Sequence, residues 1–242
     1  MTDAIFAHPR LAPLYDAFEG ERDDLAAYLA IADELNAHDV VDLGCGTGSL
    51  AILLAESGRR VVGVDPAGAS LEVARSKDPS ITVTWIHGDA TALPPGTADL
   101  VVMAGNVAQV FLTDESWSLM LTAVHTALRP DGYLVFETRR PGRRDWENWT
   151  ADTAAAIADT PASGRVERRL DVTAVSLPFV SFRYTYRFLA DDSIITSDST
   201  LRFRSRDDVR ASLHAHGYRV VDVRDAPDRP GREYVFIAEC TR

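Results

Sequence analysis

A glycine-rich turn and a later acid are the residues of this chain whose types and spacing could do chemistry. Gly44, Gly46 and Gly48 follow the short apolar run 40–43 and precede a helical stretch. Glycines permit positive φ and close backbone approach to a ligand, at the sheet edge where open α/β folds bind ligands. Asp65 ends the next predicted strand, about 17 residues beyond Gly48, where a carboxylate can accept hydrogen bonds from a ribose. The pattern predicts a nucleotide-type site.

The spacing of the glycines disfavours one common nucleotide site, and the position of the lysine excludes another. A dinucleotide-binding turn needs G-x-G-x-x-G, whereas the third glycine here comes one residue early, which disfavours NAD. A phosphate-binding P-loop needs G-x-x-x-x-G-K-[ST]. The sequence has one lysine, Lys77, and it lies outside any glycine turn, so a P-loop is excluded.

Residues 41–48 closely resemble the first motif of class I S-adenosylmethionine-dependent methyltransferases. The resemblance extends over roughly residues 40–140, through Val64-Asp65, Gly88-Asp89-Ala90, 99–106 and 128–134, in the order of the family's later motifs. It implies the small-molecule type of this family, with S-adenosylmethionine as the cofactor. The positions that it assigns to the cofactor are Tyr15, Asp42, Gly44, Cys45, Gly46, Asp65, Pro66, Asp89, Ala90 and Ala104.

The resemblance also implies a role for most of these positions. Gly44 and Gly46 would line the aminoacyl end of the cofactor, and Asp65 the ribose. Asp89 and the amide of Ala90 would read the adenine edge.

Three cofactor positions carry further or competing interpretations. Ala104 would face the sulfonium side of the cofactor. Tyr15 either closes over the cofactor or substrate, or is a hydrophobic staple for the helix that follows. Cys45 could be a nucleophile, but no histidine neighbours it in the sequence, so we interpret it as a small packing residue.

Polar residues at the ends of the third, fourth and fifth predicted strands are candidates for the acceptor site. Asn106 and Gln109 follow the fourth strand, and His87 ends the third, where it is either a general base or a hydrogen-bonded surface group. All three are candidate catalytic residues, and Asn106 and Gln109 also candidate substrate ligands. Arg139 and Arg140 leave the fifth strand and could hold an acceptor carboxylate, or be solvated loop charges.

Alternating strands and helices must position these residues. The expected helices are 23–37, 49–57, 69–76 and 114–128, and the expected strands are 40–43, 60–65, 81–86, 98–103 and 133–136. This order predicts an α/β fold with a doubly wound, mainly parallel seven-stranded sheet, a Rossmann-like methyltransferase fold that ends in an antiparallel strand. Helix 207–216 and strands 219–223 and 233–240 complete it.

The segment 145–204 interrupts this rhythm. Three strand-like runs, 166–177, 179–189 and 194–203, predict antiparallel hairpins, after a polar, alanine-rich stretch. We expect one domain, 1–242, with 145–204 embedded in it as a β-rich lid over the carboxyl edge of the sheet. The aromatic residues of the second run, Phe179, Phe182, Tyr184 and Tyr186, are core residues or substrate platforms, and the core interpretation is favoured.

Composition limits the partners. The 242 residues carry 36 acids and 25 Lys and Arg, a net charge of −11, which argues against nucleic acid and anionic membranes as partners. Gly105-Asn106 also departs from the Asn-Pro-Pro-Tyr motif of nucleic-acid and protein-amide methyltransferases. Apolar runs are too short to span a bilayer and no secretory signal is visible, so we expect a cytoplasmic protein. Two cysteines and scattered histidines give no metal-ligand spacing, and no metal is expected.

The sequence therefore predicts methyl transfer to an oxygen or nitrogen of a small-molecule acceptor. Positioning and desolvation suffice for this reaction, so that a dedicated base is optional. Two alternatives remain open. One is an NAD(P) dehydrogenase, and the other is a non-catalytic cofactor-binding protein that uses the β-rich segment for partner binding or for a homodimer.

Overall fold

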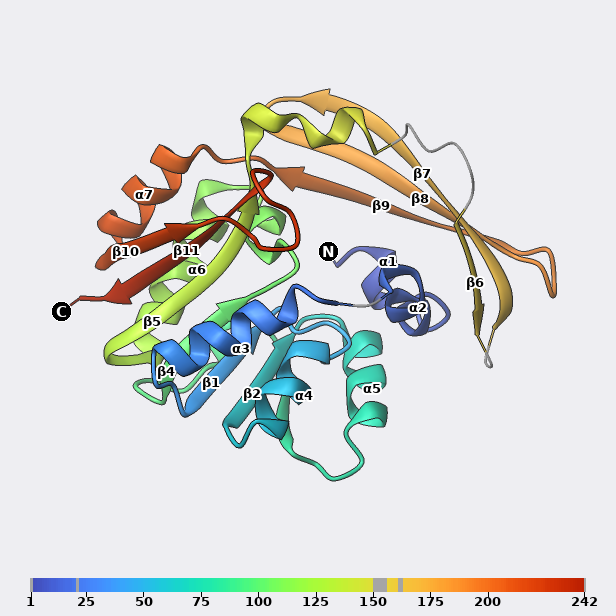
Figure 1. Cartoon of the computed structure of the whole chain (residues 1–242). Coiled ribbons are helices and arrows are strands. Elements are labelled where there is room, and N and C mark those ends of the chain that lie inside the picture. The colour runs from blue at the N-terminus through green and yellow to red at the C-terminus, as the bar shows by residue number, and fades with distance from the viewer. Residues whose placement is uncertain (1, 21, 150–155, 161–162, 242) are drawn as a thin grey trace.

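The computed structural model describes residues 2–20, 22–149, 156–160 and 163–241. Its larger sheet has the strand order β10-β11-β5-β4-β1-β2-β3 (Figure 1). The strands of this sheet are β1 (Asp39–Leu43), β2 (Arg60–Asp65), β3 (Val83–His87), β4 (Ala98–Met103), β5 (Leu128–Arg139), β10 (Tyr218–Arg224) and β11 (Glu233–Cys240). Strands β1 to β5 pair in parallel, whereas β11 is antiparallel to both β5 and β10. The predicted seven-stranded sheet with its antiparallel last strand is confirmed.

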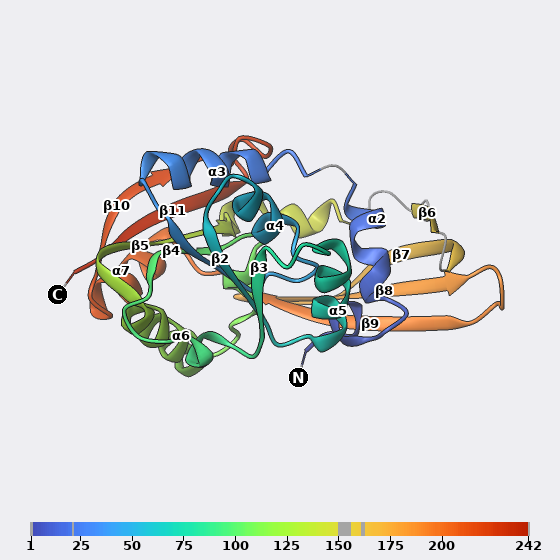
Figure 2. The ribbon, with the colours of Figure 1, turned by 90° about the horizontal axis from the view of Figure 1, so that it is seen from below.

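Helices cover both faces of this sheet, as Figure 2 shows from below. They are α3 (Leu25–Glu34), α4 (Ser49–Glu56), α5 (Gly68–Lys77), α6 (Asp114–Ala127) and α7 (Arg206–Ala215). Alternate residues of β4 serve the two layers, because successive side chains of a strand point to opposite faces. Val102 belongs to the core beneath α3 and α4, and Met103 to the core beneath α6 and α7. The strand is apolar on both faces for this reason, which is the pattern of a buried parallel sheet.

A second, four-stranded antiparallel sheet leaves the larger one after β5 and returns before α7. Two short 3-10 turns, η4 (Pro141–Arg143) and η5 (Asp145–Glu147), lead into it. Its strands are β6 (Ala156–Thr160), β7 (Gly164–Ser176), β8 (Phe179–Phe188) and β9 (Ile194–Arg202), in that order. We call it the lid sheet. Residues 150–155 and 161–162 of the predicted insertion 145–204 lie outside the described part of the chain.

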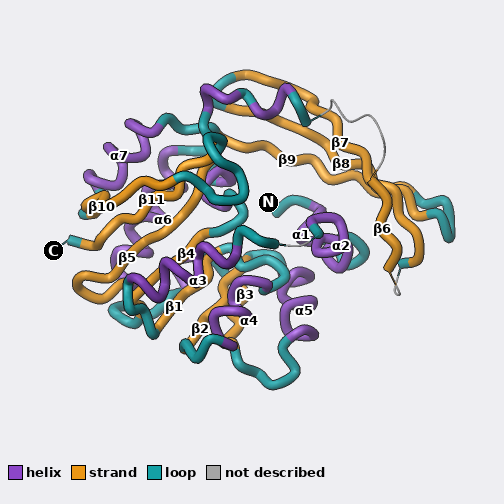
Figure 3. Tube along the Cα trace, in the orientation of Figure 1, coloured by secondary structure: helices purple, strands orange, loops and turns teal. Residues whose placement is uncertain are grey.

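The N-terminal segment lies under the lid sheet, which arches over it in Figures 1 and 3. It contains α1 (Ala4–Ala7), η1 (Ala12–Leu14) and α2 (Tyr15–Glu19). Leu11 and Leu14 pack with Tyr186 and Phe188 of β8 in one buried cluster. Tyr186 is therefore a core residue, as the sequence favoured.

Three local expectations differ from the structure. The strand expected from 81 begins at Val83, because Ile81 has a φ of 53° and is 84% exposed. The strand expected from 133 already begins at Leu128, which pairs with Ala98 of β4. The sequence did not predict β6, whose residues form a strand by pairing with β7.

No helix in the described ranges is long and apolar enough to cross a membrane.

Candidate functional site

The glycine turn between β1 and α4 is fixed by the carboxylate that ends β2. Gly46 N donates a hydrogen bond to Asp65 Oδ2 at 2.8 Å, and Ala67 N donates to Asp65 Oδ1 at 2.7 Å. Gly44 has a φ of 77°, and a Cβ there would lie 2.7 Å from a methyl carbon of Val107, in the turn after β4. The turn is therefore held from two neighbouring strands, at the carboxyl edge of the sheet.

A second acid lies beneath the turn. Burial and the neighbouring Asp65 raise the pKa of Asp42 to about 7. Burial also raises the pKa of Asp65, while the amides of Ala67 and Gly46 oppose that rise. Burial raises the pKa of the Cys45 thiol, so that this group stays protonated at neutral pH. That state fits the interpretation of Cys45 as a packing residue.

The end of β3 presents an exposed acid and a histidine. Asp89 Oδ1 accepts hydrogen bonds from Thr91 N at 2.9 Å and from Thr91 Oγ1 at 2.6 Å, which lower the pKa of the carboxyl. Both hydrogen bonds from Thr91 go to the same oxygen of Asp89, Oδ1. The next residue, Ala90, is buried. His87 is exposed, and its Nε2 lies 3.0 Å from Pro66 O. Asp65, Pro66, His87 and Asp89 thus share one edge of the sheet.

Asn106, after β4, is held by two buried acids. It has a φ of 62° and is 3% exposed. Its Nδ2 donates to Glu233 Oε1 at 3.1 Å and to Glu137 Oε1 at 3.3 Å, and its backbone N donates to Glu137 Oε1 at 2.9 Å. These bonds orient the amide, because only its nitrogen can donate to a carboxylate. Asn106 Oδ1 has no hydrogen-bond partner among the described residues.

Glu137, which was not among the predicted site residues, lies at the centre of this cluster. Tyr28 of α3 donates its hydroxyl to Glu137 Oε2 at 2.6 Å. Burial, followed by the nearby Glu233, raises the pKa of Glu137 to about 7. The sequence does contain a signal for Glu137, which directly follows the apolar run 134–136 of a predicted strand. An acid at such a position needs partners, because acids are almost never fully buried without them.

The other predicted acceptor residues separate into two places. Arg139 NH1 donates to Gln109 Oε1 at 3.2 Å, and Gln109 Nε2 donates to Arg202 O at 3.4 Å. Arg140 instead donates its Nε to Glu233 O at 3.0 Å and pairs with Asp225. The structure therefore brings Asn106, Gln109 and Arg139 together, and it leaves the Arg140 guanidinium on the neighbouring loop.

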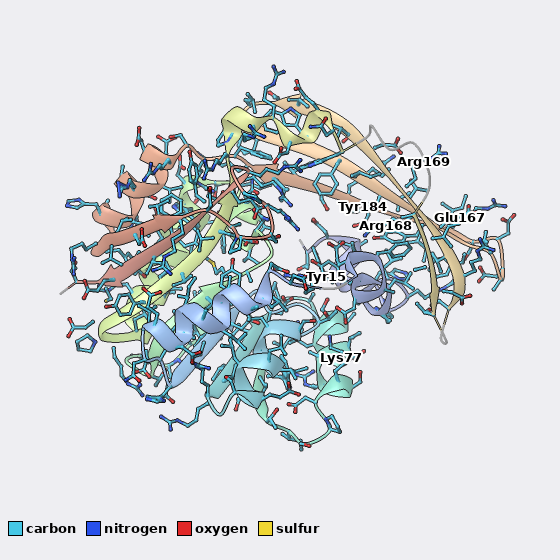
Figure 4. All side chains as sticks on the ribbon, viewed as in Figure 1. Tyr15, Lys77, Glu167, Arg168, Arg169 and Tyr184 are labelled. Atoms are coloured by element: carbon cyan, nitrogen blue, oxygen red, sulfur yellow. The ribbon has the colours of Figure 1, made fainter. Side chains whose placement is uncertain are left out.

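The N-terminal segment bridges the glycine turn and the lid sheet, which the sequence did not predict. Asp16 accepts hydrogen bonds from Thr47 Oγ1 at 2.5 Å and from Lys77 Nζ at 2.7 Å. One turn further along α2, Glu19 Oε1 lies 3.1 Å from Arg168 NH1 of β7. In Figure 4, Arg168 and Tyr184 lie below the lid sheet on the side of Tyr15. Tyr15 is half-buried and packs on Phe6 with ring centroids 5.6 Å apart.

Comparison with known proteins gives matches that agree with this arrangement. A family described as a methyltransferase domain matches residues 40–132. An uncharacterized methyltransferase of Oceanobacillus iheyensis is 33% identical over 133 residues, which cover 52% of this chain and 62% of that protein. The chain thus spans less than two thirds of the length of that relative.

Two further proteins match over more of their length. A trans-aconitate 2-methyltransferase of Azoarcus sp. is 34% identical over 182 residues, which cover 70% of this chain and 68% of that protein. The structure of the CcbJ methyltransferase from Streptomyces caelestis superposes with a TM-score of 0.77 at 18% identity, over 98% of this chain and 97% of that one. The structural match extends to nearly the whole chain, lid sheet included.

Proposed function

Because the chain belongs to the class I S-adenosylmethionine-dependent methyltransferases, we propose that it transfers a methyl group to an oxygen or nitrogen of a small molecule bound under the lid sheet. The observation that carries this proposal is the bond between Gly46 N and Asp65 Oδ2. It joins the glycine turn to an acid at the carboxyl edge of the sheet, where this family binds its cofactor.

The residues present fit the cofactor. Gly46 and Gly105 both have positive φ, and a Cβ at either would meet no atom within 4 Å, so both face open space at this edge. Asp65 and Asp89 supply acceptors, which suit the hydroxyls and amino group of an adenosine. When bound, the cofactor supplies a methyl group on a positively charged sulfur, and the sulfur keeps the electron pair as the acceptor takes the methyl.

Each group of residues has a proposed role toward the cofactor. Asp65 and Pro66 would lie beside the ribose, and Asp89 with Ala90 beside the adenine. The remaining positions would enclose the aminoacyl end and the sulfur: Tyr15, Asp42, Gly44, Cys45, Gly46 and Ala104.

The acceptor side is proposed to lie between the turn after β4 and the lid sheet. Asn106, Gln109 and Arg139 are there, and the catalytic contribution of the chain is to orient the acceptor and exclude water. His87 lies apart from them, bonded to Pro66 O. The Azoarcus relative is named for methylation of trans-aconitate, which supports a small-molecule acceptor.

Titration calorimetry with S-adenosylhomocysteine tests the cofactor site. We expect Asp65→Asn to weaken binding at least about tenfold, or about 1.4 kcal/mol. Asp39→Asn is the matched control, because Asp39 begins β1 at the opposite edge of the sheet, where it pairs with Arg60. Equal affinities for the two variants would contradict the assignment of Asp65.

A methyl-transfer assay tests the activity. Wild-type protein is incubated with S-adenosylmethionine and a panel of amines, phenols and carboxylic acids, and S-adenosylhomocysteine is measured. We expect turnover of at least one acceptor. Tight binding of S-adenosylhomocysteine without any turnover would instead favour the non-catalytic alternative, in which the lid sheet serves a partner or a second copy of the chain.

A further inference from the structure

Arg139 lies where an acceptor would meet the protein, at the end of β5 under the lid sheet. Its side chain is 21% exposed and is therefore largely desolvated. NH1 donates to Gln109 Oε1 at 3.2 Å, and the guanidinium carbon lies 5.5 Å from the ring centre of Trp149. Gln109 and Trp149 thus hold the guanidinium between the turn after β4 and the segment that leads into the lid sheet.

The carboxylate that pairs with Arg139 is shared with other donors. Among the described residues, Arg139 pairs with the carboxylate of Glu233, which is 3.7 Å from Nε and so beyond hydrogen-bond distance. Glu233 Oε1 already accepts from Arg229 NH1 at 2.9 Å and from Asn106 Nδ2 at 3.1 Å. Burial lowers the pKa of Arg139, whereas Glu233 and Glu137 oppose this shift. A buried charge is costly unless it is paired, so this guanidinium favours an additional anion.

Three other arginines near the lid sheet have closer carboxylates. Arg168 NH1 lies 3.1 Å from Glu19, Arg202 NH2 lies 2.8 Å from Asp114, and Arg22 makes two bonds of 2.7 Å to Asp24. Arg139 differs from these because, among the described residues, no carboxylate lies within hydrogen-bond distance of its five N–H donors, and Glu233 pairs with it only at 3.7 Å. A carboxylate matches this fork in geometry and forms two parallel hydrogen bonds with it.

A row of aromatic rings continues from Arg139 under the lid sheet. Trp149 and Phe182 have ring centroids 5.3 Å apart, and Phe182 and Tyr184 5.5 Å apart. Arg168 closes the row, 4.8 Å from the ring centre of Tyr184. Trp149, Phe182 and Tyr184 are each only half-buried, unlike the core residue Tyr186. Successive rings meet edge to face, at interplanar angles of 79° and 83°, which is a packing that a further aromatic ring can join.

We infer that the acceptor is a planar, aromatic monocarboxylate, whose carboxylate binds Arg139 and whose ring packs on Trp149, Phe182 and Tyr184. This inference rests on the proposed function and names its substrate class. A single negative charge fits better than a phosphate dianion, because the buried acids Glu233 and Glu137 lie behind the one guanidinium. The methylated oxygen or nitrogen is then a second group of the same molecule.

The test is titration calorimetry on wild-type protein saturated with S-adenosylhomocysteine. The probes are 4-hydroxybenzoate, 4-aminobenzoate and 4-hydroxyphenylacetate, each beside its carboxamide, with 4-hydroxyphenyl phosphate as the dianion. We expect each acid to bind at least about tenfold more tightly than its amide. Amides that bind as well as the acids, a phosphate that binds more tightly, or a protein that binds the cofactor product and none of the acids would each overturn the inference.

Variants of Arg139 test whether the preference for acids over amides depends on this side chain. Arg139→Gln should abolish the preference for acids over amides, and Arg139→Lys should keep part of it, because Lys retains the charge without the fork. Arg169→Gln is the matched control, since Arg169 is exposed on the opposite face of β7 from Arg168. An acid preference that survives Arg139→Gln would overturn the inference. The affinity of each variant for S-adenosylhomocysteine reports separately on the fold and on the proposed function.

Discussion

Tyr28 donates its hydroxyl hydrogen to Glu137 Oε2 at 2.6 Å, inside the protein, and thereby joins helix α3 to strand β5. The other oxygen of the same carboxylate accepts from the backbone N of Asn106. One buried acid therefore connects the helix that precedes the glycine turn to the turn that carries the acceptor candidates. Its protonation state is tied to the stability of this part of the fold.

Tyr28→Phe should destabilise the protein more at pH 8 than at pH 5. The Tyr28 hydroxyl stabilises the ionised form of Glu137, so its removal costs most when the carboxylate is charged. We expect a loss of about 2 kcal/mol in the free energy of unfolding at pH 8 and about 1 kcal/mol at pH 5. Urea denaturation measures both values. The control is Tyr133→Phe, on the same strand as Glu137. A pH-independent loss would show that the bond does not favour the ionised acid.

Glu137→Gln should change the pH dependence of stability. The folded pKa of about 7 is raised from 4.5, so the folded protein binds a proton that the unfolded chain releases between these values. Wild-type protein should therefore lose stability relative to Glu137→Gln as the pH rises from 4.5 to 7, by on the order of 2 kcal/mol, with no further change above pH 8. Asp42 titrates in the same range in both proteins and cancels in the difference.

Denaturant unfolding of both proteins at pH 5, 6, 7 and 8 measures this difference. A constant difference across the range would mean that Glu137 is ionised throughout in the folded protein, as it is in the unfolded chain.

Asp16→Ala should speed the release of S-adenosylhomocysteine. The substitution removes the bonds from Thr47 and Lys77 that hold α2 against the glycine turn, and both ionic partners are partly exposed. We expect dissociation to accelerate several-fold, with a change below about 1 kcal/mol in the free energy of unfolding. Stopped-flow displacement measures the rate. Asp33→Ala, which removes a surface pair with Arg59, should leave it unchanged.

Gly63→Ala should destabilise the protein through Trp85. A Cβ at Gly63 would lie 2.6 Å from two carbons of the Trp85 ring, and the same ring lies 2.5 Å from where a Cβ of Gly48 would be. Overpacking of this kind costs about 1–3 kcal/mol. Gly142→Ala is the control, because its Cβ would meet no atom within 4 Å. Thermal melts of equal midpoint would show that the ring shifts without cost.

The larger sheet was predictable from the sequence because its strands are continuous apolar runs between glycine turns. The run 100–103 is buried on both faces, and the acids at 65 and 89 mark where β2 and β3 end. Such local patterns define both the elements and the edge of the sheet at which they meet. The structure confirms this fold and places Asp65 against Gly46.

The contacts that join distant segments were not predictable in the same way. Glu137, Asn106 and Glu233 come from three separate places in the chain, and only the fold shows that they share hydrogen bonds. Arg139 and Arg140 are neighbours in sequence with identical side chains, yet one faces Gln109 and the other Asp225, since successive residues point to opposite sides of an extended chain.

The two acids of α2 connect the glycine turn to the lid sheet, and so would link the proposed cofactor site to the proposed acceptor site. Asp16 contacts the glycine turn and Glu19 contacts the lid sheet, so a shift of this short helix is felt at both sites. If binding of one ligand tightens the other through this helix, the effect must be reciprocal and of equal size. The affinity of an acceptor measured without S-adenosylhomocysteine would then understate its affinity in the ternary complex by the same factor by which the acceptor increases the affinity for S-adenosylhomocysteine.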